Sequence, residues 1–323
     1  MTDWLRPPPT GRPYQQLGRT DVHAWWRPIV GLLAIAVLTT IAGTVFVGVV
    51  FALVWFATGE VLRFGRGPEE LFTNHLANLI AMIGSIGVLL PIVGVVTLVV
   101  ERRGIGSLSS TAGRVRWRWL ALCFLPAIGY MLAVVGGSYV ADAITHRADD
   151  PIGDWIGWHA FWPALLVIVL LVPIQATAEE YAFRGWVLQA IGSFTFEDRP
   201  GRAGRRLARV FSTPWPAILL AAIPFVAGHA YTDWGLLDIG AFAVVTGWVV
   251  VQTGGLEAGI ALHIVNNMVG MSLSAAEGDV PLAQGSVPVP DVIVDTVPML
   301  LWAAVIVWMF RHTGSKRPMN RLS

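Results

Sequence analysis

The sequence of 323 residues has few charged side chains and almost no cysteine. Asp, Glu, Lys and Arg together make up 13% of the chain, whereas 55% is hydrophobic and the mean hydropathy is +0.63. This composition is too apolar for an ordinary soluble domain. Cys123 is the only cysteine, which excludes an internal disulfide framework and a Cys-x-x-Cys metal site. The net charge of +1 gives no indication of nucleic acid as a partner.

Two common hydrolase signatures are also absent. The chain contains neither Gly-x-Ser-x-Gly nor His-Glu-x-x-His, so the sequence supports neither a serine nucleophile elbow nor a zincin helix. The N-terminal stretch 1–27 is polar and rich in proline, and the apolar run that follows it is longer than the core of a signal peptide. We therefore expect an uncleaved spanning helix after residue 27.

Long apolar runs dominate the rest of the chain. A spanning helix needs about 20 largely apolar residues, and continuous runs of this kind favour helices over a membrane barrel. Eight runs cover about 28–56, 75–100, 117–140, 162–193, 214–230, 237–251, 256–273 and 292–310. The sequence thus predicts an all-α, polytopic transmembrane helix bundle with about eight spans.

Arginine placement agrees with this number of spans. Basic residues gather in alternate loops and acidic residues occupy the loops between them, and short cytoplasmic loops carry such a positive excess. Eight spans with both termini cytoplasmic satisfy the pattern. We expect a polar cytoplasmic segment at 1–27, one transmembrane domain at 28–310 and a cytoplasmic tail at 311–323. The composition suggests a bacterial cytoplasmic membrane.

Three of the apolar runs carry polar side chains at membrane depth, where a charged residue costs about 2.5 to 3.5 kcal/mol on insertion. Such residues are functional-site hypotheses by default, although a lone His or Asn commonly makes only a hydrogen bond between helices. The fourth run contains Glu179, Glu180 and Arg184, the fifth contains Phe225 and His229, and the seventh contains His263, Asn266 and Asn267.

Helical geometry assigns different directions to the two glutamates. Glu180 and Arg184 lie one turn apart on one face, so we expect a structural ion pair between them. Glu179, about 100° away around the helix, then points into the bundle as the reactive group.

The expected depth of Glu179 in the membrane can be compared with that of His229. At about 1.5 Å per residue, Glu179 and His229 each lie roughly 21 to 22 Å from the loop that joins their helices, so both fit one level. His263 and Asn267 share one face of the seventh run and can converge on the same cavity.

In this order the three clusters resemble the signature of the CAAX-protease and bacteriocin-processing family, also called the Abi family. That signature is Glu-Glu-x-x-x-Arg, then Phe-x-x-x-His, then His-x-x-x-Asn or Asp, and the resemblance covers about 162–273. It implies an all-helical intramembrane endopeptidase that cleaves membrane-associated peptides or proteins.

The resemblance also implies roles for individual residues. The glutamate matching Glu179, assisted by His229, activates water, and the pair matching His263 and Asn267 stabilises the oxyanion. Supporting roles fall to the remaining motif residues and their neighbour: Glu180, Arg184, Phe225 and Asn266.

Metal use and the class of function stay open at this point. Glu179, His229 and His263 are of the kind that binds a catalytic divalent ion such as zinc, but a metal-free glutamate mechanism uses the same residues. The alternative is a non-catalytic membrane scaffold, or an immunity or regulatory protein, that binds peptides in the same cavity. A small transporter would use intramembrane carboxylates for coupling ions, but no inverted repeat is evident.

Overall fold

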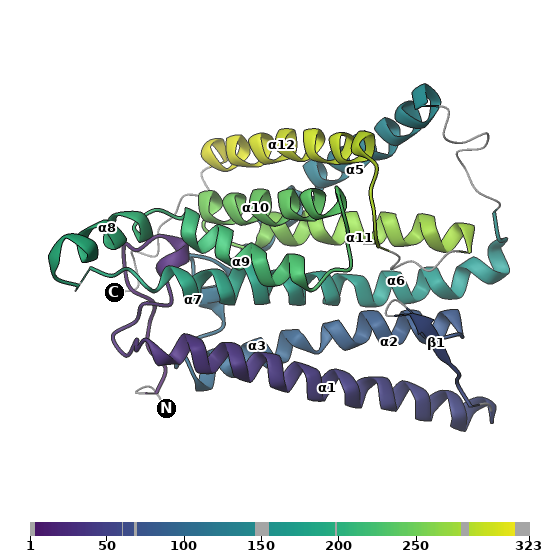
Figure 1. Ribbon diagram of the computed structural model, residues 1–323, viewed down its shortest axis with the longest axis horizontal. Coiled ribbons are helices and arrows are strands. Elements are labelled where there is room, and N and C mark those ends of the chain that lie inside the picture. The colour runs from purple at the N-terminus through teal and green to yellow at the C-terminus, as the bar shows by residue number, and fades with distance from the viewer. Residues whose placement is uncertain are drawn as a thin grey trace.

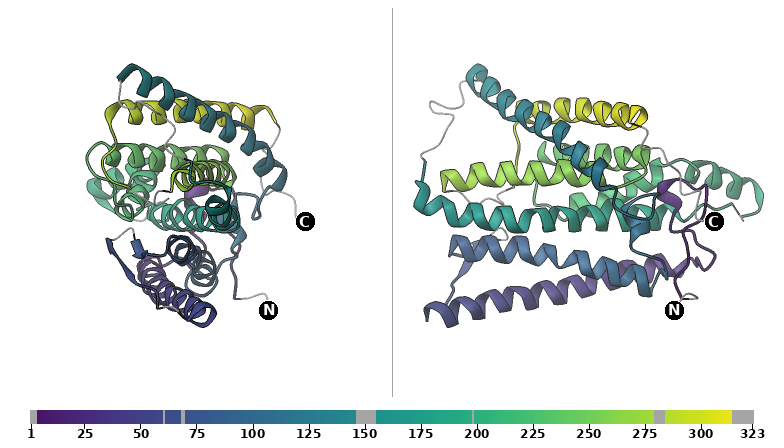
Figure 2. Two further views of the ribbon diagram at one scale, coloured as in Figure 1. Left: turned by 90° about the vertical axis from the view of Figure 1, so that its right-hand side faces the viewer. Right: turned by 180° about the vertical axis from the view of Figure 1, so that it is seen from behind.

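Long helices that run roughly side by side make up most of the molecule (Figures 1 and 2). The computed structural model describes residues 4–59, 61–67, 70–145, 155–197, 199–278 and 284–313. The main helices of the bundle are α1 (Trp26–Thr58), α2 (His75–Gly87), α3 (Leu89–Val99), α5 (Trp117–Thr145), α6 (Trp158–Glu179), α10 (Gly235–Thr253), α11 (Glu257–Glu277) and α12 (Val289–His312). The remaining elements are the 3-10 helix η1 (Tyr14–Gln16), the strands β1 (Phe64–Gly67) and β2 (Glu70–Phe72), α4 (Gly106–Ser109), the π-helix η2 (Glu180–Val187), α7 (Leu188–Gly192), α8 (Gly201–Phe211) and α9 (Trp215–Ala227).

Seven helical stretches within the described residues are long and apolar enough to cross a membrane, and the bent pair α8–α9 would make an eighth. Helices α2 and α3 together form one of these stretches, and α6, η2 and α7 together form another. Most apolar side chains of α1 are exposed on its surface, as expected for side chains that face lipid. The predicted polytopic helix bundle is confirmed, and the chain is an integral membrane protein.

The fifth predicted run, 214–230, forms a shorter helix than expected. Helix α9 has 13 residues, which rise about 20 Å, whereas the hydrocarbon core of a bilayer is about 30 Å thick. A turn follows α9, and α10 begins at Gly235. Helix α9 alone is therefore too short to span, and His229 lies just beyond its end.

The polar N-terminal segment folds against one end of the bundle. Tyr14 and Leu17 are buried in the same apolar cluster as Trp186 of η2. The Tyr14 hydroxyl donates a hydrogen bond to the Leu108 carbonyl (2.5 Å). The segment thus contributes apolar side chains to the core, although its composition is polar. Of the predicted tail 311–323, residues 314–323 lie outside the described residues.

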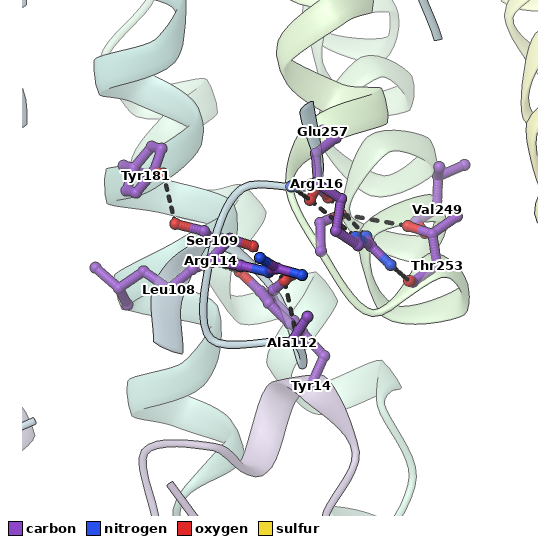
Figure 3. A network of polar contacts seen from close by, with 12 residues as sticks. Tyr14, Leu108, Ser109, Ala112, Arg114, Arg116, Tyr181, Val249, Thr253 and Glu257 are labelled. Carbon is purple, nitrogen blue, oxygen red and sulfur yellow. Dashed lines mark hydrogen bonds and ion pairs between the residues drawn. The ribbon is translucent and has the colours of Figure 1, made fainter. Parts of the chain in front are cut away.

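A polar network fixes the turn between α10 and α11 (Figure 3). Gly254 adopts a left-handed conformation (φ +66°) that favours glycine. Arg116 donates to both oxygens of the Glu257 carboxylate (2.9 and 2.6 Å) and to the Thr253 carbonyl (2.9 Å). This pairing explains why a glutamate is buried at the start of α11. It also positions the helix that carries His263, less than two turns further on.

Candidate active site

The helix that carries the first motif changes from α to π geometry directly after Glu179. Single π turns within helices are rare and frequently occur at functional sites. Arg184 Nη1 lies 3.2 Å from Glu180 Oε1, and both side chains are buried. The predicted ion pair is therefore present.

Two further contacts hold the buried guanidinium of Arg184. It lies over the ring of Phe225, 3.8 Å from the ring centroid, and its Nε donates a hydrogen bond to the Thr246 hydroxyl (3.2 Å). A cation above an aromatic face is stabilised by the ring quadrupole, most strongly away from water. The phenylalanine of the second motif therefore anchors the arginine of the first.

Both glutamates of the first motif contact one imidazole ring. His263 Nε2 lies 3.2 Å from Glu179 Oε2, and His263 Nδ1 lies 3.0 Å from Glu180 Oε1. The expected division, with Glu180 engaged by Arg184 and Glu179 alone facing the cavity partners, is thus incomplete. Each ring nitrogen reaches a different carboxylate, so the angular separation of the glutamates does not prevent a shared partner.

The close approach of α11 to the first motif depends on Gly259, one turn before His263. A Cβ atom at this position would lie 2.5 Å from Glu180 Oε2, closer than ordinary packing allows. The role of this glycine was not predicted, because no local pattern in the sequence indicates which helix lies opposite.

His229 follows α9 directly and keeps one nitrogen available. Its Nδ1 lies 2.7 Å from the Phe225 carbonyl, and a carbonyl can only accept, so Nδ1 carries the hydrogen. The Nε2 atom of the neutral ring is then an acceptor. The imidazole also packs against the rings of Phe225 and Tyr231.

A cavity of about 490 Å³ brings the three motifs together. Its lining includes residues from each predicted cluster: Glu179, Phe225, His229, His263, Asn266 and Asn267. A more open groove of about 510 Å³ shares Glu179 and His229 with the cavity and is bounded by α1 through Thr39, Thr40 and Thr44. Glu179 and His229 therefore lie where two hollow regions meet, and a cavity of this size suits a small ligand or a short peptide segment.

The side-chain amide of Gln175, which the sequence analysis does not assign to the site, contacts the third motif. Asn267 Nδ2 donates to Gln175 Oε1 (3.2 Å), and Asn266 Nδ2 lies 3.4 Å from Asn267 Oδ1. Gln175 is buried one turn before Glu179. The signal that could have found it is an amide in an apolar run, since such amides commonly bond between helices.

A second group of acidic residues lines the same cavity. Asp238 of α10 and Asp295 of α12 both line this cavity and interact electrostatically, and the Tyr130 hydroxyl of α5 hydrogen-bonds to Asp295. No role was predicted for these residues. An aspartate inside an apolar run was the available signal, because ionisable residues at membrane depth are rare.

The three side chains considered for zinc do not fit as a metal-binding set. Within the described part of the chain, no group of three or more His, Cys, Asp or Glu side chains is arranged to hold a metal ion. Both ring nitrogens of His263 face carboxylates. Its nitrogen atoms are therefore already engaged with the two glutamates of the first motif.

Residues 158–269 match the family described as type II CAAX prenyl endopeptidase Rce1-like. The matched segment begins with α6 and ends within α11, so it contains all three motifs. The predicted family resemblance is confirmed. By this description, the matched segment is similar to a family of endopeptidases.

One curated relative has no described activity of its own. The uncharacterized protein YyaK of Bacillus subtilis (strain 168) is 25% identical over 199 residues. The matched region covers 62% of this chain and 59% of that relative, so the chain spans less than two thirds of its length. No solved structure matches the chain significantly.

Proposed function

We propose that this protein is an intramembrane endopeptidase that hydrolyses peptide bonds of membrane-associated substrates, with Glu179 as the base that activates water. The observation that carries the proposal is a buried Glu179 carboxylate beside His229 at the junction of the cavity and the groove. Glu180, its neighbour, is already occupied by Arg184. Glu179 is therefore the carboxylate that can receive a proton from water in the cavity.

The remaining residues divide the proton and charge transfers. Glu179 takes a proton from water as the oxygen attacks the peptide carbonyl. His229 has an Nε2 atom that can accept this proton and deliver it to the departing amine. The Asn267 amide is the donor for the oxyanion. His263 has both nitrogens against glutamates, which favours orienting Glu179 over a direct contact with the oxyanion.

The distinction from a metalloprotease rests on the arrangement of the same residues. The side chains of Glu179, His229 and His263 do not form a ligand set, which supports a glutamate-dependent, metal-independent base. The substrate then meets protein groups alone, and the low-dielectric cavity strengthens their interactions with developing charge.

A non-catalytic scaffold or regulator that binds peptides in the same cavity is the competing function. It needs the cavity walls but no base. Substituting the base without changing its size separates the two functions, because peptide binding tolerates Glu179→Gln, whereas hydrolysis does not.

The test compares membrane and secreted peptides from cells that carry wild-type protein, Glu179→Gln or Glu277→Gln at equal abundance. Glu277 is exposed at the end of α11, so its substitution makes the same charge change outside the cavity. We expect uncleaved precursors only with Glu179→Gln, and a rate of cleavage in vitro reduced by about 10²- to 10⁴-fold. Identical peptide profiles in all three strains would support the scaffold.

A further inference from the structure

The short helix α8 projects from the end of the bundle at which α1 begins (Figure 1), and Figure 2 shows the same projection from behind. It connects α7, at the end of the helix that carries Glu179, to α9, which leads to His229. The axes of α8 and α9 differ by 70°. If α9 runs along the membrane normal, α8 therefore lies about 20° from the membrane plane, since 90° minus 70° is 20°.

The side chains of α8 separate into two faces. At about 100° per residue, all four arginines of the helix fall within one sector of roughly 100°, and all four are exposed: Arg202, Arg205, Arg206 and Arg209. The opposite side carries Leu207, which is 44% exposed, whereas Val210, 53% exposed, lies at the edge of the arginine sector, one turn after Arg206. Phe211, on the same side as Leu207, packs edge-on against Phe196. The basic face and the apolar face are therefore both available outside the bundle.

This combination has a specific physical meaning in a membrane protein. A helix with arginines on one face and aliphatic residues on the other is stable at the boundary between headgroups and acyl chains. Trp215, exposed at the start of α9, is of the residue type that gathers at this depth. In an orientation close to the membrane plane, the apolar side of α8 enters the acyl region while the arginines stay at the headgroups.

We propose that α8 is an interfacial helix that binds anionic phospholipids of the membrane in which the protein is embedded. Arginine guanidinium groups pair with phosphate through planar, bidentate hydrogen bonds, and a surface rich in anionic lipid attracts each basic residue near it. The four arginines supply the charge complementarity. This inference does not depend on the proposed protease activity.

The single cysteine of the chain allows a direct test by site-specific spin labelling. Full-length protein with Cys123→Ala receives one new cysteine at Leu207 or Arg206, and is reconstituted in nanodiscs of phosphatidylcholine alone or of equal parts phosphatidylcholine and phosphatidylglycerol. Accessibility to oxygen, which concentrates in lipid, is compared with accessibility to a water-soluble nickel chelate. We expect the ratio of oxygen to nickel accessibility to be higher at 207 than at 206, and to rise further with phosphatidylglycerol.

A charge-neutral helix provides the matched variant. The combination of Arg202→Gln, Arg205→Gln, Arg206→Gln and Arg209→Gln, with the label at 207, should lose the rise caused by phosphatidylglycerol. The control Arg114→Gln with Arg118→Gln removes two exposed arginines just before and at the start of α5 and should keep this rise. Equal nickel accessibility at 207 and 206 in both lipids overturns the proposal. The proposal is also overturned if the ratio of oxygen to nickel accessibility at 207 does not change with phosphatidylglycerol. Dipolar coupling between labels of two copies, which would indicate protein contact instead, overturns it as well.

Discussion

The ion pair at the start of α11 predicts a large effect of a substitution outside the cavity lining. Glu257 is almost completely buried, and Arg116 contacts both of its carboxylate oxygens. Glu257→Gln keeps the size of the side chain but leaves the guanidinium without its counter-ion. Breaking a buried pair from one side costs about 3 to 5 kcal/mol. The Arg116 side chain retains 14% exposure and its bond to Thr253, so the lower end of this range, about 3 kcal/mol, applies.

Cys123 reports this loss of stability directly. It is the only cysteine and is fully buried beside Trp119, so a thiol-reactive fluorescent dye labels it only when the bundle opens. At about 2 °C per kcal/mol for a chain of this size, Glu257→Gln should lower the apparent midpoint in detergent by about 6 °C. The matched control, Arg118→Gln, removes a charge from an exposed side chain on the same stretch and should leave the midpoint nearly unchanged.

A double-mutant cycle tests the reasoning more strictly. The combination of Arg116→Gln with Glu257→Gln leaves no uncompensated buried charge, so its loss of stability should be smaller than the sum of the two single losses. Strict additivity, or a shift with Glu257→Gln no larger than that with Arg118→Gln, would refute the idea that this pair holds the α10–α11 turn.

Three further outcomes follow from other parts of the structure. Desolvation, followed by the charges of Arg19 and Arg27, lowers the pKa of His23. Because the folded protein favours the neutral ring, its stability falls as the pH drops below the usual histidine pKa of about 6.5. His23→Gln should therefore reduce the fall in thermal midpoint between about pH 7.5 and about pH 5.5. A Cβ at Gly192 would lie 2.0 Å from the Gln15 carbonyl oxygen, so Gly192→Ala should cost about 1 to 3 kcal/mol and speed tryptic cleavage of the N-terminal segment, whereas Gly129→Ala, with open space around it, should not. Peptide cleavage by the purified protein should persist after treatment with a strong divalent-metal chelator, and its loss together with restoration by added zinc would contradict the metal-independent base.

Much of the bundle was accessible from local properties of the chain. The spans could be located because a membrane requires continuous apolar runs and helices that satisfy their own backbone hydrogen bonds. The pairing of Glu180 with Arg184 could be predicted because residues four apart share a helical face. A common depth for Glu179 and His229 follows from the fixed rise per residue, and both line the same cavity.

Other features depend on which helices become neighbours. The approach of His263 to both glutamates, the stacking of Arg184 on Phe225, and the part played by Gln175 all require contacts between different helices. The rotation of each helix about its own axis results from packing against all of its neighbours. That rotation decides which side chains meet in the cavity, whereas the sequence by itself determined only the position and depth of those side chains along each helix.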